Sequence, residues 1–222
     1  MISILFMRPN RRQALWFCLF LLSVSLTGCA AYQVGGNIQK GRVALITGEP
    51  NVALGYFQRA AELDPNYTLN FTQLRQGVWP YVGRAYYNQN EFSEARKAFE
   101  KARSRHHEDN LAKLYLGLVL ARDGDRPKGL KEIEAGLIGL GEWLDFLKGY
   151  HPEGQFWDRR GDLRNEIQKN LGVIHGKEIN WARLISGVEW LGEKFEEEID
   201  LARRDERQEL LQNGDDDGGE EP

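Results

Sequence analysis

Cysteine and histidine are scarce in this chain of 222 residues, which has two cysteines and four histidines. None of the histidines forms the His-x3-His or His-Glu-x2-His spacing that suits a metal site on a helix. The chain also lacks a Gly-x-Ser-x-Gly nucleophile motif and a Gly-x4-Gly-Lys phosphate loop. These absences predict a protein that is not an enzyme and that binds no metal, no cofactor and no small-molecule substrate. An unrecognised catalytic site in residues 144–211 is the alternative that they leave.

The chain also has no excess of positive charge. The chain has 29 Lys and Arg against 33 Asp and Glu, and it has no basic cluster of the kind that binds phosphate backbones. We therefore expect no nucleic-acid partner. A long apolar run is also absent, because residues 14–26 fall short of the roughly 20 residues that cross a bilayer.

The first 29 residues nevertheless carry a targeting pattern. Arg8, Arg11 and Arg12 precede the short apolar run, and small residues follow it, as in a secretory signal peptide. The sequence Leu-Thr-Gly-Cys, which ends at Cys29, resembles the lipobox of bacterial lipoproteins. This resemblance implies a signal peptide over residues 1–28, a lipidated Cys29 and a short tether over residues 29–33. An ordinary secreted protein is the alternative, and translation can start at Met1 or at Met7.

Cleavage before Cys29 would leave a chain with no free thiol, because Cys18 departs with the signal and Cys29 is acylated. The resemblance to bacterial lipoproteins implies a membrane location through the lipid anchor. Ala30, which follows the cysteine, favours the outer membrane facing the periplasm in bacteria with two membranes. The choice between inner and outer membrane stays open.

Three segments of the remaining chain repeat one pattern of small and large residues. In each copy, twelve residues separate a glycine of a first helix from a small residue of a second helix: Gly41 and Ala53, Gly83 and Ala95, Gly117 and Gly129. A large residue follows four positions later, and a further small residue completes each copy: Phe57 with Ala60, Phe99 with Ala102, and Ile133 with Gly136. Two helices approach closely only where side chains are small, and the large residues fill the space that remains. The pattern predicts three helical hairpins.

The pattern resembles the tetratricopeptide-repeat family, with Trp79-x2-Val82-Gly83-x2-Tyr86 as its fullest match. The resemblance implies an all-α solenoid of about three repeats, over residues 34–67, 76–109 and 110–143. Residues 68–75 are an eight-residue insert, which we interpret as about two added helical turns because Phe71, Leu74 and Val78 follow a helical spacing. Gly48, Asn90 and Gly124 stand seven residues after the three first-helix glycines, where a left-handed residue can end each helix.

Helical periodicity continues beyond the repeats, over residues 144–211. Asn180 is a candidate N-cap, and an apolar stripe follows it: Trp181, Leu184, Val188, Leu191 and Phe195. A solenoid must cover the apolar face of its last repeat, so we expect this extension to cap it. The alternative is that Trp181, Trp190 and Phe195 face outward toward a partner helix. Residues 212–222 hold acidic residues and glycines, which predict a disordered tail.

In this family, the first helices of successive hairpins line a concave groove that receives a partner segment. The resemblance assigns seven residues to that groove: Arg42, Arg84, Tyr87, Asn88, Leu114, Leu118 and Arg122. Three arginines beside an apolar shelf would suit a partner with a carboxylate and large apolar side chains. The alternative is that these arginines are solvated or pair with acids of the capping helices.

The resemblances together predict a lipid-anchored scaffold or assembly factor of the bacterial cell envelope with protein partners. Outer-membrane protein, pilus and polysaccharide-export machineries are the candidate settings. A regulatory adaptor that holds an envelope enzyme, such as a wall hydrolase, is the alternative.

Overall fold

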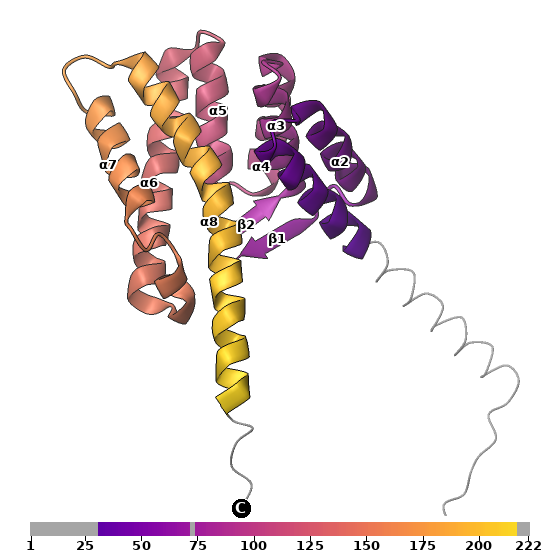
Figure 1. Cartoon of the computed structure of the whole chain (residues 1–222). Coiled ribbons are helices and arrows are strands. Elements are labelled where there is room, and N and C mark those ends of the chain that lie inside the picture. Colours follow the sequence, from indigo (N-terminus) through magenta and orange to yellow (C-terminus); the bar gives the residue numbers. More distant parts are fainter. Residues whose placement is uncertain (1–30, 72–73, 217–222) are drawn as a thin grey trace, which may run out of the picture.

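The computed structural model describes residues 31–71 and 74–216, and these residues form an array of helices with one small sheet (Figure 1). The all-α fold class predicted from the sequence is therefore confirmed. Cys29 and the signal-peptide residues lie outside the described part. In the described part, no helix is both long enough and apolar enough to cross a membrane.

The elements follow one another along the chain as hairpins of helices. A first helix occupies residues 31–46. It is followed by α2 (Pro50–Leu63), β1 (Thr68–Phe71), β2 (Leu74–Gly77), α3 (Val78–Asn88), α4 (Phe92–Arg105), α5 (Asn110–Arg122), α6 (Arg126–Tyr150), a 3-10 turn (Pro152–Phe156), α7 (Asp162–Ile174) and α8 (Trp181–Asp216).

The turns of the three hairpins have the backbone geometry that the sequence predicts. Gly48, Asn90 and Gly124 have φ angles of 78°, 61° and 95°. The left-handed region is costly for residues with a branched or bulky side chain, so glycine and asparagine suit these positions. Each residue ends the first helix of a hairpin and lets the chain return alongside it.

Glycine and a large apolar residue also meet inside each hairpin. A Cβ on Gly83 would lie 2.7 Å from the Phe99 ring, and a Cβ on Gly117 would lie 2.6 Å from Ile133. In the first hairpin a Cβ on Gly41 would overlap the Phe57 ring, and in the third a Cβ on Gly129 would also come within 2.8 Å of the Gly117 carbonyl oxygen. The three repeats thus share one packing arrangement, in which the first helix is hollowed at a glycine and the second helix fills the hollow.

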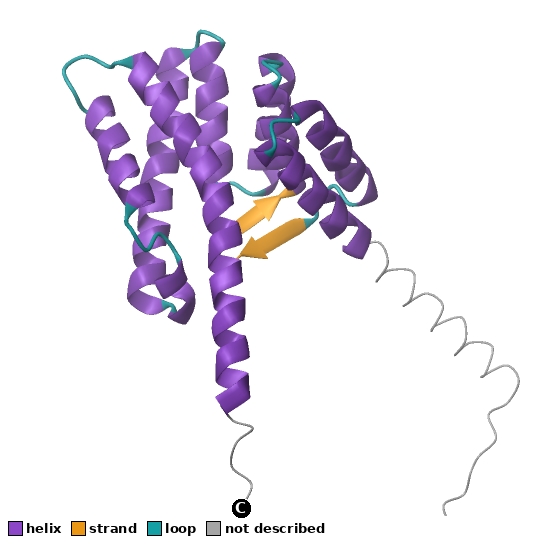
Figure 2. Ribbon diagram, viewed as in Figure 1, coloured by secondary structure: helices purple, strands orange, loops and turns teal. Residues whose placement is uncertain are grey.

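The insert between the first two hairpins is a β-hairpin and not the added helical turns predicted from its spacing (Figure 2). β1 and β2 pair antiparallel, with Thr68 opposite Gly77 and Leu69 opposite Gln76. A helix through this segment would lose a backbone hydrogen bond at Pro80, which has no N–H. Pro80 instead lies in the first turn of α3, where a proline leaves no bond unmade.

Three predicted boundaries fall inside helices. α6 runs on through residue 143 to Tyr150, because its buried stripe continues from Leu137 and Leu140 to Leu144 and Leu147. The start of the predicted tail, residues 212–216, continues α8, and residues 217–222 lie outside the described part. Residues 31–33, predicted as tether, already belong to the first helix.

α8 is the element that unites the array. It begins as predicted, with the Asn180 side chain accepting a hydrogen bond from the Arg183 backbone N–H at 3.0 Å. In Figure 1 it passes in front of α5 and α6 and continues below them. Its apolar stripe is buried at Leu184, Val188, Leu191, Phe195, Ile199 and Ala202. Phe195 therefore does not face outward, whereas Trp190 is 40% exposed. Trp181, predicted to begin this stripe, is only half-buried, and Ile199 was not predicted.

Candidate functional site

The inner face of the repeats is the surface formed by the first helix, α3 and α5, and it carries the residues predicted to bind a partner. α8 lies along this face, and its acidic residues meet the three predicted arginines. Leu114 and Leu118, the predicted apolar shelf, are fully buried. The predicted residues therefore do not form one open groove. Acids of α8 pair with the three arginines, and Leu114 packs against Gly136 of α6. Tyr87, Asn88 and Arg122 line a cavity beside α8.

One carboxylate of α8 holds two arginines from different repeats. The Arg42 Nε atom lies 2.6 Å from Glu196 Oε2, and Arg84 contacts the other oxygen of the same carboxylate. Arg42 also donates to Asp200 at 2.9 Å and to the Glu196 backbone carbonyl at 3.2 Å. All three members of the Arg42–Glu196–Arg84 cluster are buried. Each guanidinium fork thus finds its acceptors within the chain.

The electrostatics of this cluster favour the charged forms. Burial alone would raise the pKa of Glu196, but the adjacent Arg84 and Arg42 outweigh burial and hold that pKa below its ordinary value. The Arg84 guanidinium also lies 5.1 Å from the centre of the Tyr115 ring, within the range of a cation–π contact. A buried charge that lost its partner here would be strongly unfavourable.

The third arginine takes part in a smaller network near the hairpin turns. Arg122 lies 2.5 Å from Glu189 of α8, and its Nε donates to the Tyr87 hydroxyl at 2.7 Å. The Tyr87 hydroxyl in turn donates to Glu189 at 2.5 Å. Burial and the neighbouring Glu189 carboxylate raise the pKa of Tyr87, so it stays a donor at physiological pH. Asn88 is exposed beside this network and lines a cavity of about 380 Å³ with Tyr87 and Arg122.

Small residues let α8 approach the repeats closely. A Cβ on Gly192 would overlap the Tyr115 hydroxyl, and a Cβ on Gly187 would overlap the Asn170 side chain of α7. Sequence reasoning missed Gly192 and the acids Glu189, Glu196 and Asp200. Their spacing along α8, by seven and then four residues, was the available signal, because it places all three acids on one face of a helix.

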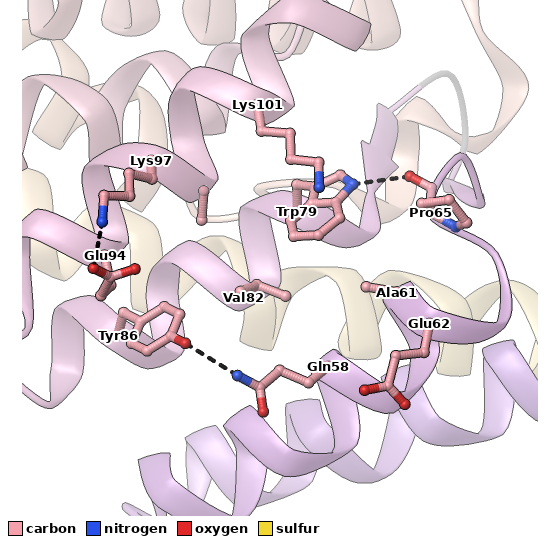
Figure 3. Close-up of a pocket in the computed structure, with 11 residues that line it drawn as sticks. Gln58, Ala61, Glu62, Pro65, Trp79, Val82, Tyr86, Glu94, Lys97 and Lys101 are labelled. Carbon is pink, nitrogen blue, oxygen red and sulfur yellow. Dashed lines mark hydrogen bonds and ion pairs between the residues drawn. The ribbon is translucent and has the colours of Figure 1, made fainter.

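Another cavity lies away from this face, between α2, α3 and α4 (Figure 3). We call this cavity of about 580 Å³ the outer groove. Figure 3 shows Val82 and Ala61 at its floor and Trp79 at one end. The Trp79 indole N–H donates to the Pro65 carbonyl at 2.9 Å, which fixes the ring. The floor is apolar and its lining includes both acidic and basic side chains.

The charges of the outer groove are only partly paired within the chain. Lys97 lies 2.6 Å from Glu94, and the Lys101 ammonium lies 3.4 Å from the centre of the Trp79 ring. Burial and the nearby Arg105 lower the pKa of Lys101. Among the described residues, Lys101 and Glu62 have no ion-pair partner. An apolar floor with an aromatic ring and spare charges at its rim is the composition of a protein-binding surface.

The comparison with known families agrees with the repeat pattern. The tetratricopeptide-repeat model matches residues 83–138, a segment that begins in α3 and ends in α6. The repeat resemblance of the sequence is thereby confirmed, while the lipoprotein resemblance is not addressed by this match. No curated protein and no solved structure matches the chain.

Proposed function

We propose that this tetratricopeptide-repeat protein is a lipid-anchored scaffold of the bacterial cell envelope, and that it binds its partners on its outer surface. Tetratricopeptide repeats are protein-interaction modules, so a scaffold is the function that the family match supports. The envelope setting and the role in assembling outer-membrane, pilus or export machinery rest on the signal pattern and on Cys29.

The observation that carries the choice of surface is the occupation of the inner face by α8. Five apolar residues of this helix have exposures of 1% or less: Leu184, Val188, Leu191, Phe195 and Ile199. Burying such a side chain contributes roughly 1.5–3 kcal/mol, so removing α8 would cost on the order of 10 kcal/mol before the buried ion pairs are counted. A partner segment that displaced α8 would have to regain that free energy. The inner face is therefore a structural interface within the chain.

The outer groove remains accessible and has the chemistry of a docking surface. Its aromatic ring is held in place by the bond to Pro65, so little side-chain entropy is lost when a partner packs against it. Lys101 contributes a cation at the rim that forms no ion pair among the described residues. We infer that a partner side chain packs on the floor while a carboxylate meets Lys101.

The test is crosslinking and affinity purification from detergent-solubilised envelopes with matched charge reversals. Lys101→Glu reverses the charge at the outer groove, and Lys131→Glu does so at an exposed position of α6. We expect partners to be lost from Lys101→Glu alone, with circular dichroism unchanged in both variants. Equal recovery with both variants would contradict a docking site in the outer groove. The identity of the partner distinguishes an assembly machine from a wall enzyme held by an adaptor.

The lipid anchor has its own test. Cys29→Ser removes the thiol that would be acylated and changes nothing in the described part of the chain. We expect the variant to leave the membrane fraction and to remain folded in the periplasm. A variant that still fractionates with membranes after a carbonate wash would contradict the anchor.

A further inference from the structure

A second open surface lies at the base of the second and third repeats, and it consists of two adjoining cavities. One cavity of about 270 Å³ is lined by Arg75 of β2, by Arg105 and the histidines that follow α4, and by Trp143 of α6. The other, of about 510 Å³, extends along α6 and α5. The two share Glu108, Asn110 and Trp143 as lining residues. We call the combined surface the basal groove.

One end of the basal groove is cationic. Arg75 and Arg105 pair with no acidic side chain among the described residues, in contrast to the buried arginines of the inner face. Arg105 is held by a hydrogen bond of 3.1 Å to Asn66 and lies 5.8 Å from the Trp79 ring centre. His106 lines the same cavity, and burial, Arg75 and Arg105 together lower its pKa. The two guanidinium groups therefore line one small cavity and are exposed to an external anion.

The other end is apolar. Ile138 and Phe146 of α6 line the larger cavity and are 42% and 45% exposed. Tyr150, four residues beyond Phe146, is 82% exposed. Phe146 and Tyr150 stack with ring centres 5.7 Å apart. Exposed aromatic residues grouped on one helix face are uncommon on a monomer and are typical of protein interfaces.

The remaining charges of the basal groove are two acids and one base. Glu142 is exposed within the apolar end and has no ion-pair partner among the described residues. Lys113 lines the same end and donates to the Asn110 side chain at 2.8 Å. Glu108 lies beside the cationic end, with its carboxylate 2.9 Å from His107 Nε2. A ligand carboxylate would be repelled at Glu142 and attracted at Arg75 and Arg105. An anion alone would use one end only, whereas a peptide segment can present a carboxylate and an apolar side chain together.

We propose that the basal groove binds an acidic segment of a partner protein, with its carboxylates at Arg75 and Arg105 and a large apolar side chain against Ile138 and Phe146. This inference rests on the proposed scaffold function, and it adds the partner chemistry and a second contact surface. The β-hairpin acquires a role in it, since β2 delivers Arg75 to the groove. An acidic segment fits because neither guanidinium group forms an ion pair with an acid among the described residues.

The experiment measures binding of defined probes to the full chain purified in detergent. The probe is a set of fluorescent nine-residue peptides in which one Phe is flanked by two Asp or Glu at varied spacing, with Lys-flanked peptides as controls. We expect at least one acidic peptide to bind and no Lys-flanked peptide to do so. Its binding should raise the pKa of His106, measured by NMR, because a carboxylate then lies beside the arginines.

Matched variants locate the site. Arg75→Gln with Arg105→Gln should weaken peptide binding by about tenfold or more, since each removes a charged hydrogen-bond donor. Arg59→Gln with Lys131→Gln removes the same charge at exposed positions outside the groove and should leave binding unchanged. Phe146→Ser should also weaken binding. The two arginine substitutions lie on the surface, and retained circular dichroism would confirm that the fold is intact.

Other outcomes overturn the proposal. Binding of inorganic phosphate or of phosphatidylglycerol vesicles that equals peptide binding would show a general anion site. Peptide binding that survives the Arg75 and Arg105 substitutions would place the acidic segment elsewhere. A third outcome combines two results: Lys101→Glu loses the envelope partners, and no acidic peptide binds the basal groove. The first result would support the scaffold function, and the second would reject the basal groove as a binding surface. The scaffold proposal and the present one therefore fail separately.

Discussion

The inner face and the basal groove both contain arginines, but the environments of these arginines are opposite. On the inner face, Arg42 and Arg84 are buried and share the Glu196 carboxylate. At the basal groove, Arg75 and Arg105 are exposed and form no ion pair with an acid among the described residues. Resemblance to the family points to the arginines of the first helices as the ligand-binding ones. Burial and pairing show that those arginines hold the chain together, while the exposed ones remain available.

The largest effect is expected from removing the charge that the inner arginines share. Glu196→Gln leaves two buried guanidinium groups without that carboxylate, and we expect a loss of about 3–5 kcal/mol in the free energy of unfolding. Glu197→Gln is the matched control, because its carboxylate is exposed and pairs only with Lys194. The control should change stability by less than about 0.5 kcal/mol. Urea unfolding measures both, and equal small effects would mean that the inner cluster does not hold α8.

A second buried carboxylate, that of Asp109, should make the free energy of unfolding depend on pH. Asp109 caps α5, accepting from the Ala112 backbone N–H at 2.9 Å, and burial raises its pKa to about 6. The folded chain then binds more protons than the unfolded chain between about pH 4 and pH 6, so this group lowers stability as pH rises through that window. A shift of two pKa units corresponds to a loss of about 3 kcal/mol in the free energy of unfolding across that window. Glu196 acts in the opposite sense, because its pKa is lowered in the folded chain. The stability that it contributes is lost as pH falls below the ordinary pKa of a glutamate.

Asp109→Asn tests this assignment, since asparagine keeps the capping oxygen and cannot ionise. The difference in stability between variant and wild type should change across pH 4 to pH 6, in favour of the variant at the higher pH. Chemical denaturation at closely spaced pH values measures it. A difference that stays constant with pH would show that Asp109 titrates at its ordinary value.

A smaller effect is expected from the contact of α8 with the repeats. Gly192→Ala places a methyl group against the Tyr115 hydroxyl, so α8 must shift, at a cost of about 1–3 kcal/mol. Gly172→Ala in α7 is the matched control, because nothing lies within 4 Å of its added Cβ. The control should stabilise α7 by about 0.5–1 kcal/mol. Thermal unfolding compares them, and two stabilising substitutions would show that α8 is loosely packed.

The repeats were readable from the sequence because their signals are local. Gly48, Asn90 and Gly124 are set by the geometry of a tight turn between adjacent helices, and the structure confirms all three. The β-hairpin was missed because Phe71, Leu74 and Val78 follow a helical spacing, but over a stretch too short for that spacing to decide between helix and strand.

The ion-pair partners of the inner arginines could not be predicted from local sequence patterns. Arg42 and Glu196 are 154 residues apart, and no local rule pairs them. The sequence offered the pairing with capping helices only as one of two alternatives. The choice depends on whether α8 packs along the inner face, which depends on the fit of its stripe and of Gly192 against the repeats. Long-range packing decided which arginines are structural.

Amide hydrogen exchange of α8 in the full chain, free and with a captured partner or acidic peptide bound, tests the central claim most directly. The account predicts that amides from Leu184 to Ala202 exchange as slowly as the core of α5 in both states, because α8 leaves the inner face only when the whole fold opens. Faster exchange of α8 than of α5, or its acceleration when the partner binds, would contradict the account. It would show that the inner face is a binding groove from which α8 is displaced.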